Sequence, residues 1–332
     1  MKFGLFGGAT AGRNTSTDDS DSFHKFTDFI VEADQVGLHG LFVVEHHFTG
    51  FGQVSSTMNL LTYLAAKTKK IRLGPGVMVL PWHNPILLAE QAATLDVLSN
   101  GRLDMGVGKG YRYNEFQHFC VGLDEAQSIY DESIALMNRA WTSEERFSYH
   151  SPRWNFENIV VEPAPVQKPH PPLWLAAGKP ESLKAAARGG YNLLLDQFAT
   201  FDVIAQRLAI YRDEIRAMGK VFDPMSVGVA RAILMVRNAE EREQAIENRG
   251  KALARMNAYG RSPDGKYVSS MTSDADLRLA TEEGALIGTP DEIIERIRGL
   301  QNAGVGYILL VGFGTRIPAL HTFAREILPA VA

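Results

Sequence analysis

A glutamate and two histidines stand together where a buried strand is expected to end. The apolar run 40–44 predicts a strand, and Glu45, His46 and His47 follow it. Side chains alternate along a strand, so Glu45 and His47 should share one side while His46 takes the other. Histidine titrates near neutral pH, so the triplet is a candidate for general acid/base chemistry. The alternative is a structural role, which is the commoner one for a single histidine.

Two glycine-rich turns contain residue types that suit the binding of an anion. The first, GVGKGY (106–111), combines glycines, which let the backbone approach an anion closely, with the positive charge of Lys109. The second, AGKPES (177–182), begins a predicted helix whose free N–H groups can bind phosphate. Glu181 would repel an anion unless it points away. Each turn alone is equally typical of an ordinary connection between a strand and a helix.

A third glycine-rich segment, GPGV (74–77), lies inside a predicted strand. Two glycines there indicate the close approach of another group or an unusual backbone, with a simple β-bulge as the alternative. No further group of His, Cys, Asp or Glu has the spacing of metal ligands, so the sequence predicts no metal site.

Short apolar runs alternate with helical periodicity along most of the chain. Strands are predicted at 2–6, 40–44, 71–79, 103–107, 173–177, 191–195, 226–236 and 307–311, and helices at 21–36, 56–69, 86–99, 125–140, 181–188, 203–218, 239–255, 291–303 and 320–328. Eight such units predict an α/β fold, a (β/α)8 TIM barrel with its active site at the carboxyl ends of the strands. A doubly wound open sheet is the alternative, although no GxGxxG follows the first strand.

Two segments depart from this alternation. Residues 147–161 carry three aromatic residues around Ser151-Pro152 and predict a β-hairpin insertion. Residues 258–286 are polar and rich in Gly and Ser, so they predict a long loop before the last helix and strand. The predicted helix 86–99 has almost no polar face, which indicates a second partner surface and thus a homodimer. The alternative is that the insertions cover this helix.

Length and composition limit the classes of function. A chain of 332 residues fits one TIM-barrel domain, 1–332. The net charge is −4 without a basic block, so we expect neither nucleic-acid nor membrane binding. The one cysteine, Cys120, permits no intrachain disulfide, and its apolar neighbours predict a buried thiol. With no secretory signal and no apolar run of about 18 residues, we expect a cytoplasmic protein.

Taken together, these motifs resemble the bacterial-luciferase-like flavin-dependent monooxygenases. The matching segments are FVVEHHFTGFG (42–52), LGPGVMVLPWHNPILLAEQAATLDVLSNGRLDMGVGKGY (73–111), PPLWLAAGKPESLKAAARGG (171–190) and LIGTPDEIIERI (286–297). The first two are specific when found together in this order, and the last belongs to the wider superfamily. The resemblance implies a (β/α)8 barrel, usually dimeric. It also implies reduced FMN supplied by a separate NAD(P)H:flavin reductase, and O2 that reacts to a peroxyflavin and oxygenates a small organic substrate.

The resemblance also implies roles for individual residues. His46 corresponds to the catalytic histidine and Glu45 to the neighbouring acid of the flavin site. The bond between Gly76 and Val77 falls where relatives have a non-proline cis peptide beneath the flavin ring. The cofactor positions implied are Gly76, Val77, Gly108, Lys109, Gly178, Lys179, Ser182 and Gln197, with Lys109, Gly178, Lys179 and Ser182 at the phosphate.

Three of these positions differ from luciferase itself. Lys109 replaces an arginine, Gly108 replaces a reactive cysteine near the flavin, and Gln197 replaces a tryptophan that contacts the ring. These changes favour an ordinary monooxygenase over light emission. Residues 258–286 correspond to a mobile loop, so we expect a lid over the flavin. The alternatives are a deazaflavin (F420)-dependent oxidoreductase of the same superfamily and a non-catalytic flavin-binding protein.

Overall fold

Nine strands pair in parallel in the computed structural model, which describes residues 1–10, 18–49, 54–259, 261–262, 264–265 and 277–331. Their order is β3-β2-β1-β12-β10-β9-β8-β5-β4. A parallel bridge between Leu73 of β3 and Leu103, two residues before β5, closes the sheet on itself. The predicted TIM barrel is therefore confirmed, with β3 and β4 as two halves of the third strand. The strands are β1 (Lys2–Gly7), β2 (Gly40–Val43), β3 (Arg72–Pro75), β4 (Met78–Val79), β5 (Met105–Gly108), β8 (Leu173–Ala176), β9 (Asn192–Leu195), β10 (Val227–Met235) and β12 (Tyr307–Val311).

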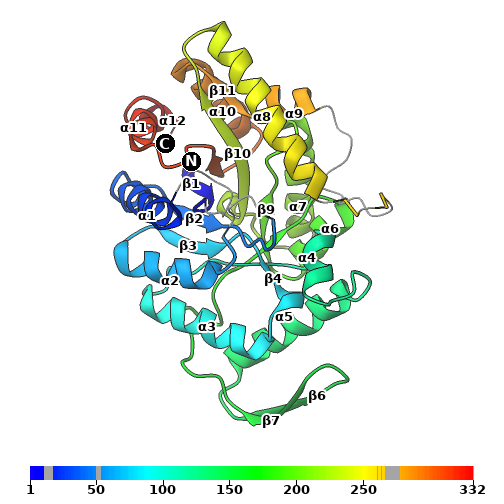
Figure 1. Ribbon diagram of the computed structural model, residues 1–332. Helices are drawn as coiled ribbons and strands as arrows, with labels where there is room; N and C mark the ends of the chain where they lie inside the picture. Colours follow the sequence, from blue (N-terminus) through cyan, green and yellow to red (C-terminus); the bar gives the residue numbers. More distant parts are fainter. Residues whose placement is uncertain (11–17, 50–53, 260, 263, 266–276, 332) are drawn as a thin grey trace.

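Helices surround the barrel (Figure 1). Side-chain caps fix the start of several of them: Asn84 accepts the N–H groups of Ile86 and Leu87 at α3, and Thr289 forms a capping box with Glu292 at α10. The helices are α1 (Asp19–Gln35), α2 (Thr57–Lys67), α3 (Pro85–Leu98), α5 (Ala126–Thr142), α6 (Pro180–Arg188), α7 (Phe201–Ala217), α8 (Ala239–Tyr259) and α10 (Pro290–Asn302), followed by α11 (Ile317–Thr322), η3 (Phe323–Ile327) and α12 (Leu328–Val331).

Apolar side chains fill two layers. One lies inside the barrel and consists of Phe42, Trp174, Leu194, Ala230, Tyr307 and Leu309. The larger one lies between the strands and the helices, and it takes the alternate strand residues such as Leu41, Leu195 and Val229. Parallel strands with both faces buried read as continuous apolar runs, which is why the sequence predicts them well.

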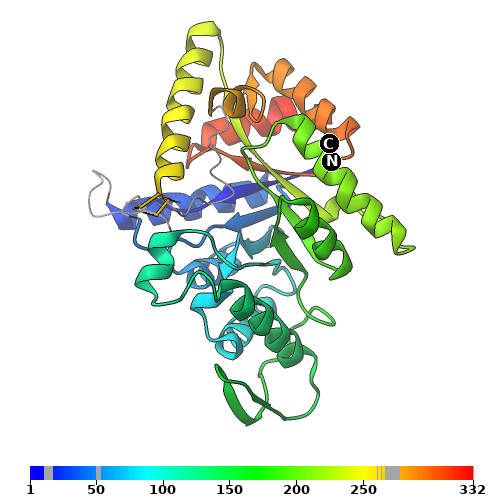
Figure 2. The same cartoon turned by 90° about the vertical axis from the view of Figure 1, so that its right-hand side faces the viewer.

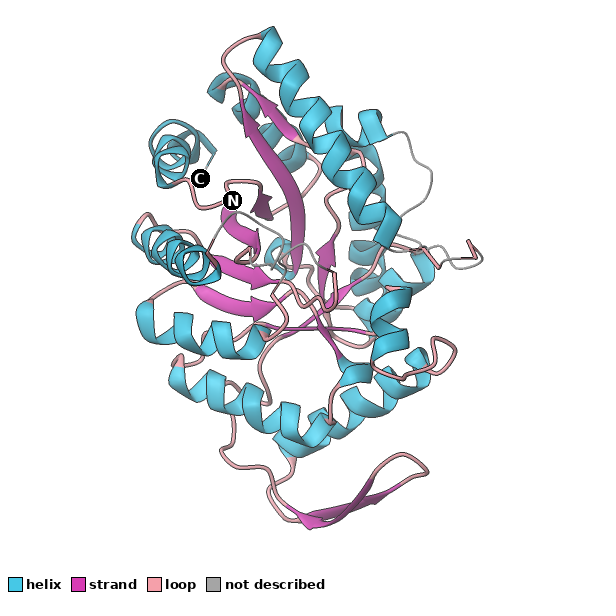
Figure 3. Cartoon of the chain, viewed as in Figure 1, coloured by secondary structure: helices cyan, strands magenta, loops and turns pink. Residues whose placement is uncertain are grey.

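The predicted hairpin insertion is confirmed. Strands β6 (Phe147–His150) and β7 (Asn155–Ile159) pair antiparallel, and both views place them outside the barrel (Figures 2 and 3). Five described elements have no counterpart in the prediction: α4 (Tyr113–His118), α9 (Leu277–Glu282), β11 (Leu286–Gly288) and the 3-10 turns η1 (Leu80–Trp82) and η2 (Pro224–Ser226). Residues 260, 263 and 266–276 of the predicted lid at 258–286 lie outside the described residues, and its described part includes the end of α8, all of α9 and the first residue of β11.

Two surface expectations need correction. Cys120 is exposed, not buried, because it follows α4 in a turn with a positive φ of 57°. The exposed face of α3 is not wholly apolar: Leu87 and Leu98 are exposed, but so are Gln91 and Thr94 between them. None of the described helices is long and apolar enough to cross a bilayer, and the described residues contain no metal-ligand cluster.

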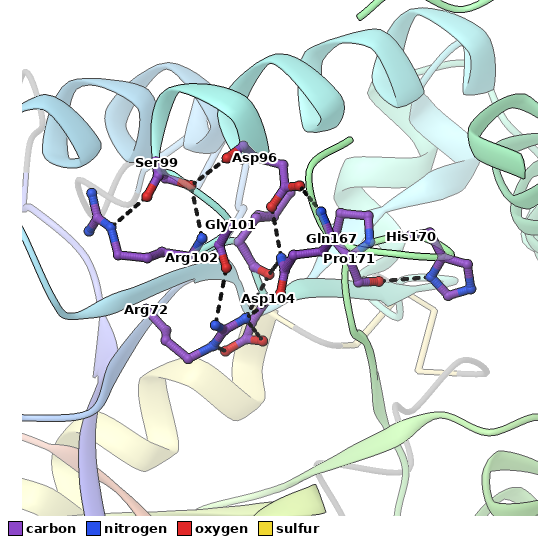
Figure 4. Close-up of polar contacts among 10 residues, drawn as sticks. Arg72, Asp96, Ser99, Gly101, Arg102, Asp104, Gln167, His170 and Pro171 are labelled. Atoms are coloured by element: carbon purple, nitrogen blue, oxygen red, sulfur yellow. Dashed lines mark hydrogen bonds and ion pairs between the residues drawn. The ribbon is translucent and has the colours of Figure 1, made fainter. Parts of the chain in front are cut away.

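A polar network closes the amino end of the barrel, away from the strand ends that carry the motifs. Arg72, the first residue of β3, pairs with Asp104 through Nε and Nη2, both at 2.8 Å (Figure 4). Gln167 reaches the same network from the segment before β8 and contacts Asp96 of α3. In TIM barrels this end serves stability, so chemistry is expected at the opposite mouth.

Candidate active site

Glu45 is the first charged residue after β2, and it is 2% exposed. Its carboxylate accepts the backbone N–H of Val79 at 2.7 Å. The Nε2 atoms of His83 and His47 lie 2.8 and 3.4 Å from its Oε1. Burial raises the pKa of Glu45, but these hydrogen bonds outweigh burial and hold the pKa below its usual value. Glu45 and His47 thus share one side, as predicted, and Glu45 is an ionised anchor for the segment after β3.

His46 turns away from this cluster and contacts the segment after β5. Its Nδ1 lies 3.1 Å from Oε1 of Glu115, and the same oxygen accepts the backbone N–H of His47 at 2.8 Å. Because a carboxylate accepts, the hydrogen of a neutral His46 belongs on Nδ1, and Nε2 keeps its lone pair. Burial lowers the pKa of His46, and Glu115 only partly offsets this. At neutral pH His46 is therefore a neutral base.

The third strand is interrupted at the predicted glycine pair. The peptide bond between Gly76 and Val77 is cis, as the resemblance implies, so the predicted continuous strand 71–79 divides into β3 and β4. A Cβ on Gly76 would lie 2.8 Å from Cε2 of Phe6, and a Cβ on Gly108 would lie 2.7 Å from Cγ2 of Val77. Glycine at 108 therefore leaves room for the Val77 side chain in the mouth.

The two glycine-rich turns lie next to each other. Strands β5 and β8 pair in parallel from Met105 with Leu173 to Val107 with Leu175, so the turns that follow emerge side by side. Lys109 and Lys179 are exposed, and Ser182 is half-buried in the first turn of α6. These positions form one basic, glycine-rich edge of the mouth.

Two charged side chains next to this edge bear on its charge. Glu181 is exposed in the first turn of α6, so its charge stays in solvent. A Cβ on Gly178 would lie 3.2 Å from Cζ of Arg207, so an arginine of α7 lies against the turn. Gln197 follows β9, the strand next to β8. Its side-chain Oε1 accepts a hydrogen bond from Arg249 Nη2 at 3.1 Å.

Comparison with known proteins agrees with this geometry. The family model for luciferase-like monooxygenases matches residues 1–306. The chain belongs to this family.

Three relatives show its range. The oxygenase component of a flavin-dependent trigonelline monooxygenase from Acinetobacter baylyi is 35% identical over 163 residues, 48% of this chain and 45% of that protein. An FMNH2-dependent dimethylsulfone monooxygenase from Pseudomonas putida is 27% identical over 81% of this chain and 76% of its own. An F420-dependent glucose-6-phosphate dehydrogenase from Kineococcus radiotolerans is 25% identical over 92% of both.

Among solved structures, the monooxygenase RslO1 from Streptomyces bottropensis superposes with a TM-score of 0.83 at 29% identity, over 100% of both chains. The monooxygenase relatives make this luciferase-like chain an oxidoreductase, and both FMNH2-dependent and F420-dependent enzymes occur among its relatives.

Aromatic side chains line the His46–His47 side of the mouth in this luciferase-like chain. The ring of His47 meets Trp82 and Phe119 edge-on, with centroids 5.5 and 4.8 Å apart. Phe48 packs on Phe119 at 5.1 Å and is 57% exposed. Phe48 and Trp82 belong to this aromatic group, whereas Phe6 packs against the cluster inside the barrel.

Three functional candidates escaped sequence reasoning because α4 is only six residues long. Glu115 and its neighbours Arg112 and Tyr111 approach His46 from this short helix and the turn before it. His83 was also missed, because it follows η1, a turn of only three residues, although it stands in the VLPWHNP segment of the resemblance. The signal available was position: polar and aromatic residues directly after the GKG turn must lie at a strand end.

Proposed function

We propose that this chain is an FMNH2-dependent monooxygenase that activates O2 and oxygenates a small organic substrate. The observation that carries the proposal is the environment of His46. Its imidazole is buried at the mouth and is tethered through Nδ1 by Glu115, and its pKa is lowered, so Nε2 is available as a proton acceptor. A histidine with a purely structural role would not need an unprotonated Nε2 at the strand ends, where TIM barrels place their active sites.

The residues present fit FMN. We assign the phosphate to Lys109, Gly178, Lys179 and Ser182, on the basic edge formed by the turns after β5 and β8. We assign the ring to the mouth above Gly76 and Val77, with Gly108 and Gln197 at its sides, because Gly108 removes bulk next to Val77. When bound, the reduced flavin supplies electrons to O2.

Two roles follow for the residues that the strand β2 presents. His46 acts as the catalytic acid/base, and its Nε2 is the atom that takes or gives the proton. Glu45 acts through other groups: it orients His47 and His83 and holds the Val79 N–H, which fixes β4 beside the cis bond. The aromatic side chains Phe48, Trp82 and Phe119 offer an apolar surface to the substrate and exclude water.

The partners follow from the same proposal. A separate NAD(P)H:flavin reductase delivers the reduced FMN, and the relative described as an oxygenase component supports this division of labour. We further propose a homodimer in the cytoplasm, acting as a single domain over 1–332.

Oxygen consumption tests the proposal directly. The purified chain mixed with photoreduced FMN should consume O2 and release peroxide when no substrate is present, faster than free reduced FMN does. His46→Ala should lower oxygenation about 10²–10⁴-fold with FMN affinity nearly unchanged. Equal oxygenation by wild type and His46→Ala would remove His46 from the mechanism.

Lys109→Ala tests the phosphate assignment. Loss of a charge-assisted contact should weaken FMN binding by about 1.5–3 kcal/mol. Riboflavin, which lacks the phosphate, should bind both proteins equally, and an unchanged FMN affinity would move the phosphate elsewhere.

An F420-dependent oxidoreductase is the second candidate, because an F420-dependent relative aligns over 92% of this chain. Titration with reduced FMN and reduced F420 separates the two. Tight binding of F420 alone, with hydride transfer and no O2 consumption, would replace the monooxygenase proposal.

A further inference from the structure

Three arginine side chains meet at the mouth end of β9 and β10. They are Arg207 of α7, Arg231 of β10 and Arg249 of α8, and residues 196–197 directly after β9 connect them. Arg207 Nη1 lies 2.6 Å from Oδ2 of Asp196. Arg231 Nη1 donates to the backbone oxygen of Asp196 at 2.9 Å, and Arg249 Nη2 donates to the backbone oxygen of residue 197 at 3.3 Å. Helix α8 passes close to the end of β9, so the three side chains share one location (Figure 1).

The charges of this arginine cluster do not balance. Among the described residues, Asp196 is the one carboxylate that contacts it, so three positive charges face one negative charge. Arg231 has no exposed surface. Burial lowers the pKa of Arg231 and of Arg249 to about 10, which leaves both charged at neutral pH. An excess of buried positive charge is costly unless an anion accompanies it.

Donor groups of the cluster also point to an anion. Nε and Nη2 of Arg231 and Nε of Arg249 are buried, and none has a hydrogen-bond partner among the described residues. Nε–H and Nη2–H form one edge of the guanidinium plane, and this edge matches the two oxygens of a carboxylate or sulfonate. The side chains of Asp196 and Arg207 are 14% and 22% exposed, so the cluster reaches solvent through these two residues.

We propose that the arginine cluster binds the anionic group of the substrate, a carboxylate or a sulfonate, with Arg231 as the bidentate partner. This proposal rests on the proposed function. The strand order places β9 and β10 across the barrel from β2, so the substrate's anionic end lies opposite His46. Arg249 also holds Gln197, the residue assigned to the side of the flavin ring. The cofactor phosphate is the competing occupant, because Arg207 backs Gly178.

Thermal unfolding with small probes tests the site without knowledge of the substrate. Wild type, with and without saturating FMN, is titrated with acetate and methanesulfonate, and with acetamide as the uncharged counterpart of acetate, at ionic strength held constant with chloride. Both anions should raise the unfolding temperature saturably with FMN present, and acetamide should not. Arg231→Met and Arg249→Met should each lower the affinity for both anions at least about tenfold, and Arg249→Lys should lower it less. Arg188→Met, an exposed arginine paired with Glu214, should behave as wild type.

Three results would overturn the proposal: no anion-specific rise in wild type, an unchanged rise in both methionine variants, or a rise that FMN abolishes. In the last case FMN affinity should fall about tenfold in both variants while riboflavin affinity stays constant, which assigns the cluster to the cofactor phosphate. Arg249→Met keeps the test valid if Arg231→Met does not fold. Oxygen consumption without any added anion tests the proposed function separately, so either can fail alone.

Discussion

Two buried carboxylates hold the histidines of the mouth, each with a different consequence. Glu45 accepts from three groups, one in β4 and one in each of the segments after β2 and β4, and these keep it ionised despite its burial. Glu115 instead accepts from the ring of His46 and the backbone of His47, so it fixes the orientation of the imidazole. One carboxylate therefore stabilises the local fold, and the other sets the chemistry of a neighbouring base.

Glu115→Gln should move the acid limb of the pH–rate profile to lower pH. The base form of His46 is lost as pH falls through its pKa, which burial already lowers and Glu115 partly raises. Removing the charge of Glu115 lowers that pKa further, and the maximal rate should fall by less than about tenfold because glutamine still accepts from Nδ1. The measurement is kcat/KM against pH. Glu125→Gln, which removes an exposed carboxylate nearby, should leave the limb in place, and a shift to higher pH would contradict the assignment.

Glu45→Gln should destabilise the fold by about 1–3 kcal/mol at pH 7, because buried donors lose an ionised acceptor. The folded-state pKa of Glu45 lies below its usual value, near 4.5. Its contribution is therefore complete above pH 4.5 and disappears as pH falls through the folded-state value. Urea unfolding at a series of pH values should show the difference between wild type and variant shrinking at acid pH. Glu144→Gln, at an exposed site, serves as the control, and a pH-independent difference would refute this account.

At the scale of elements, the amino ends of β3 and β5 stabilise the barrel, whereas their carboxyl ends form part of the mouth. Their amino ends carry the Arg72–Asp104 pair and its partners, with Asp104 only 5% exposed. Their carboxyl ends carry the cis bond and the GKG turn. The same two strands thus join a stabilising network to the mouth, and the two should respond differently to substitution.

Arg72→Met should lower the free energy of unfolding by about 3–5 kcal/mol, because it leaves the Asp104 carboxylate buried without its partner. Well below the unfolding temperature, kcat should stay within about twofold of wild type, since Arg72 lies at the end away from the mouth. Arg188→Met, which breaks an exposed pair, should cost less than about 1 kcal/mol. A large loss of kcat in the folded Arg72 variant would show that the two ends are coupled.

Sequence reasoning succeeded where the element is long and periodic. The eight barrel strands and the helices around them follow from alternation and from apolar runs. It failed at α4, β11 and the break between β3 and β4, because one or two turns of helix have too few residues for a period, and a cis bond leaves no pattern beyond its glycine. For the same reason it placed Glu45 and His46 at the mouth but missed Glu115, whose role depends on a contact 69 residues away in the chain.

At the scale of the whole molecule, helix α3 exposes apolar side chains that a second copy of the chain would cover. Leu87 and Leu98 are 53% and 56% exposed and lie eleven residues apart, which is three helical turns and so the same face. Tyr63 on the neighbouring α2 is also exposed, at 43%. Gln91 and Thr94 are exposed between the two leucines, so the face is not wholly apolar, and a partner is indicated by the exposed leucines and Tyr63 alone. A two-fold dimer would bury these three side chains against its own copy.

Leu87→Glu combined with Leu98→Glu should therefore convert a dimer to a monomer. Each leucine buried at the interface contributes about 1.5–3 kcal/mol, and two-fold symmetry counts each one twice. The measurement is the molar mass by light scattering after size-exclusion chromatography, over a range of concentrations. Val221→Glu changes the most exposed apolar residue, at 94%, in the same way but away from α3, and it should leave the mass unchanged. If the double variant keeps the mass of wild type, or if wild type is already a monomer, the α3 face is not the interface, and the exposure of Leu87 and Leu98 must be explained by some other contact.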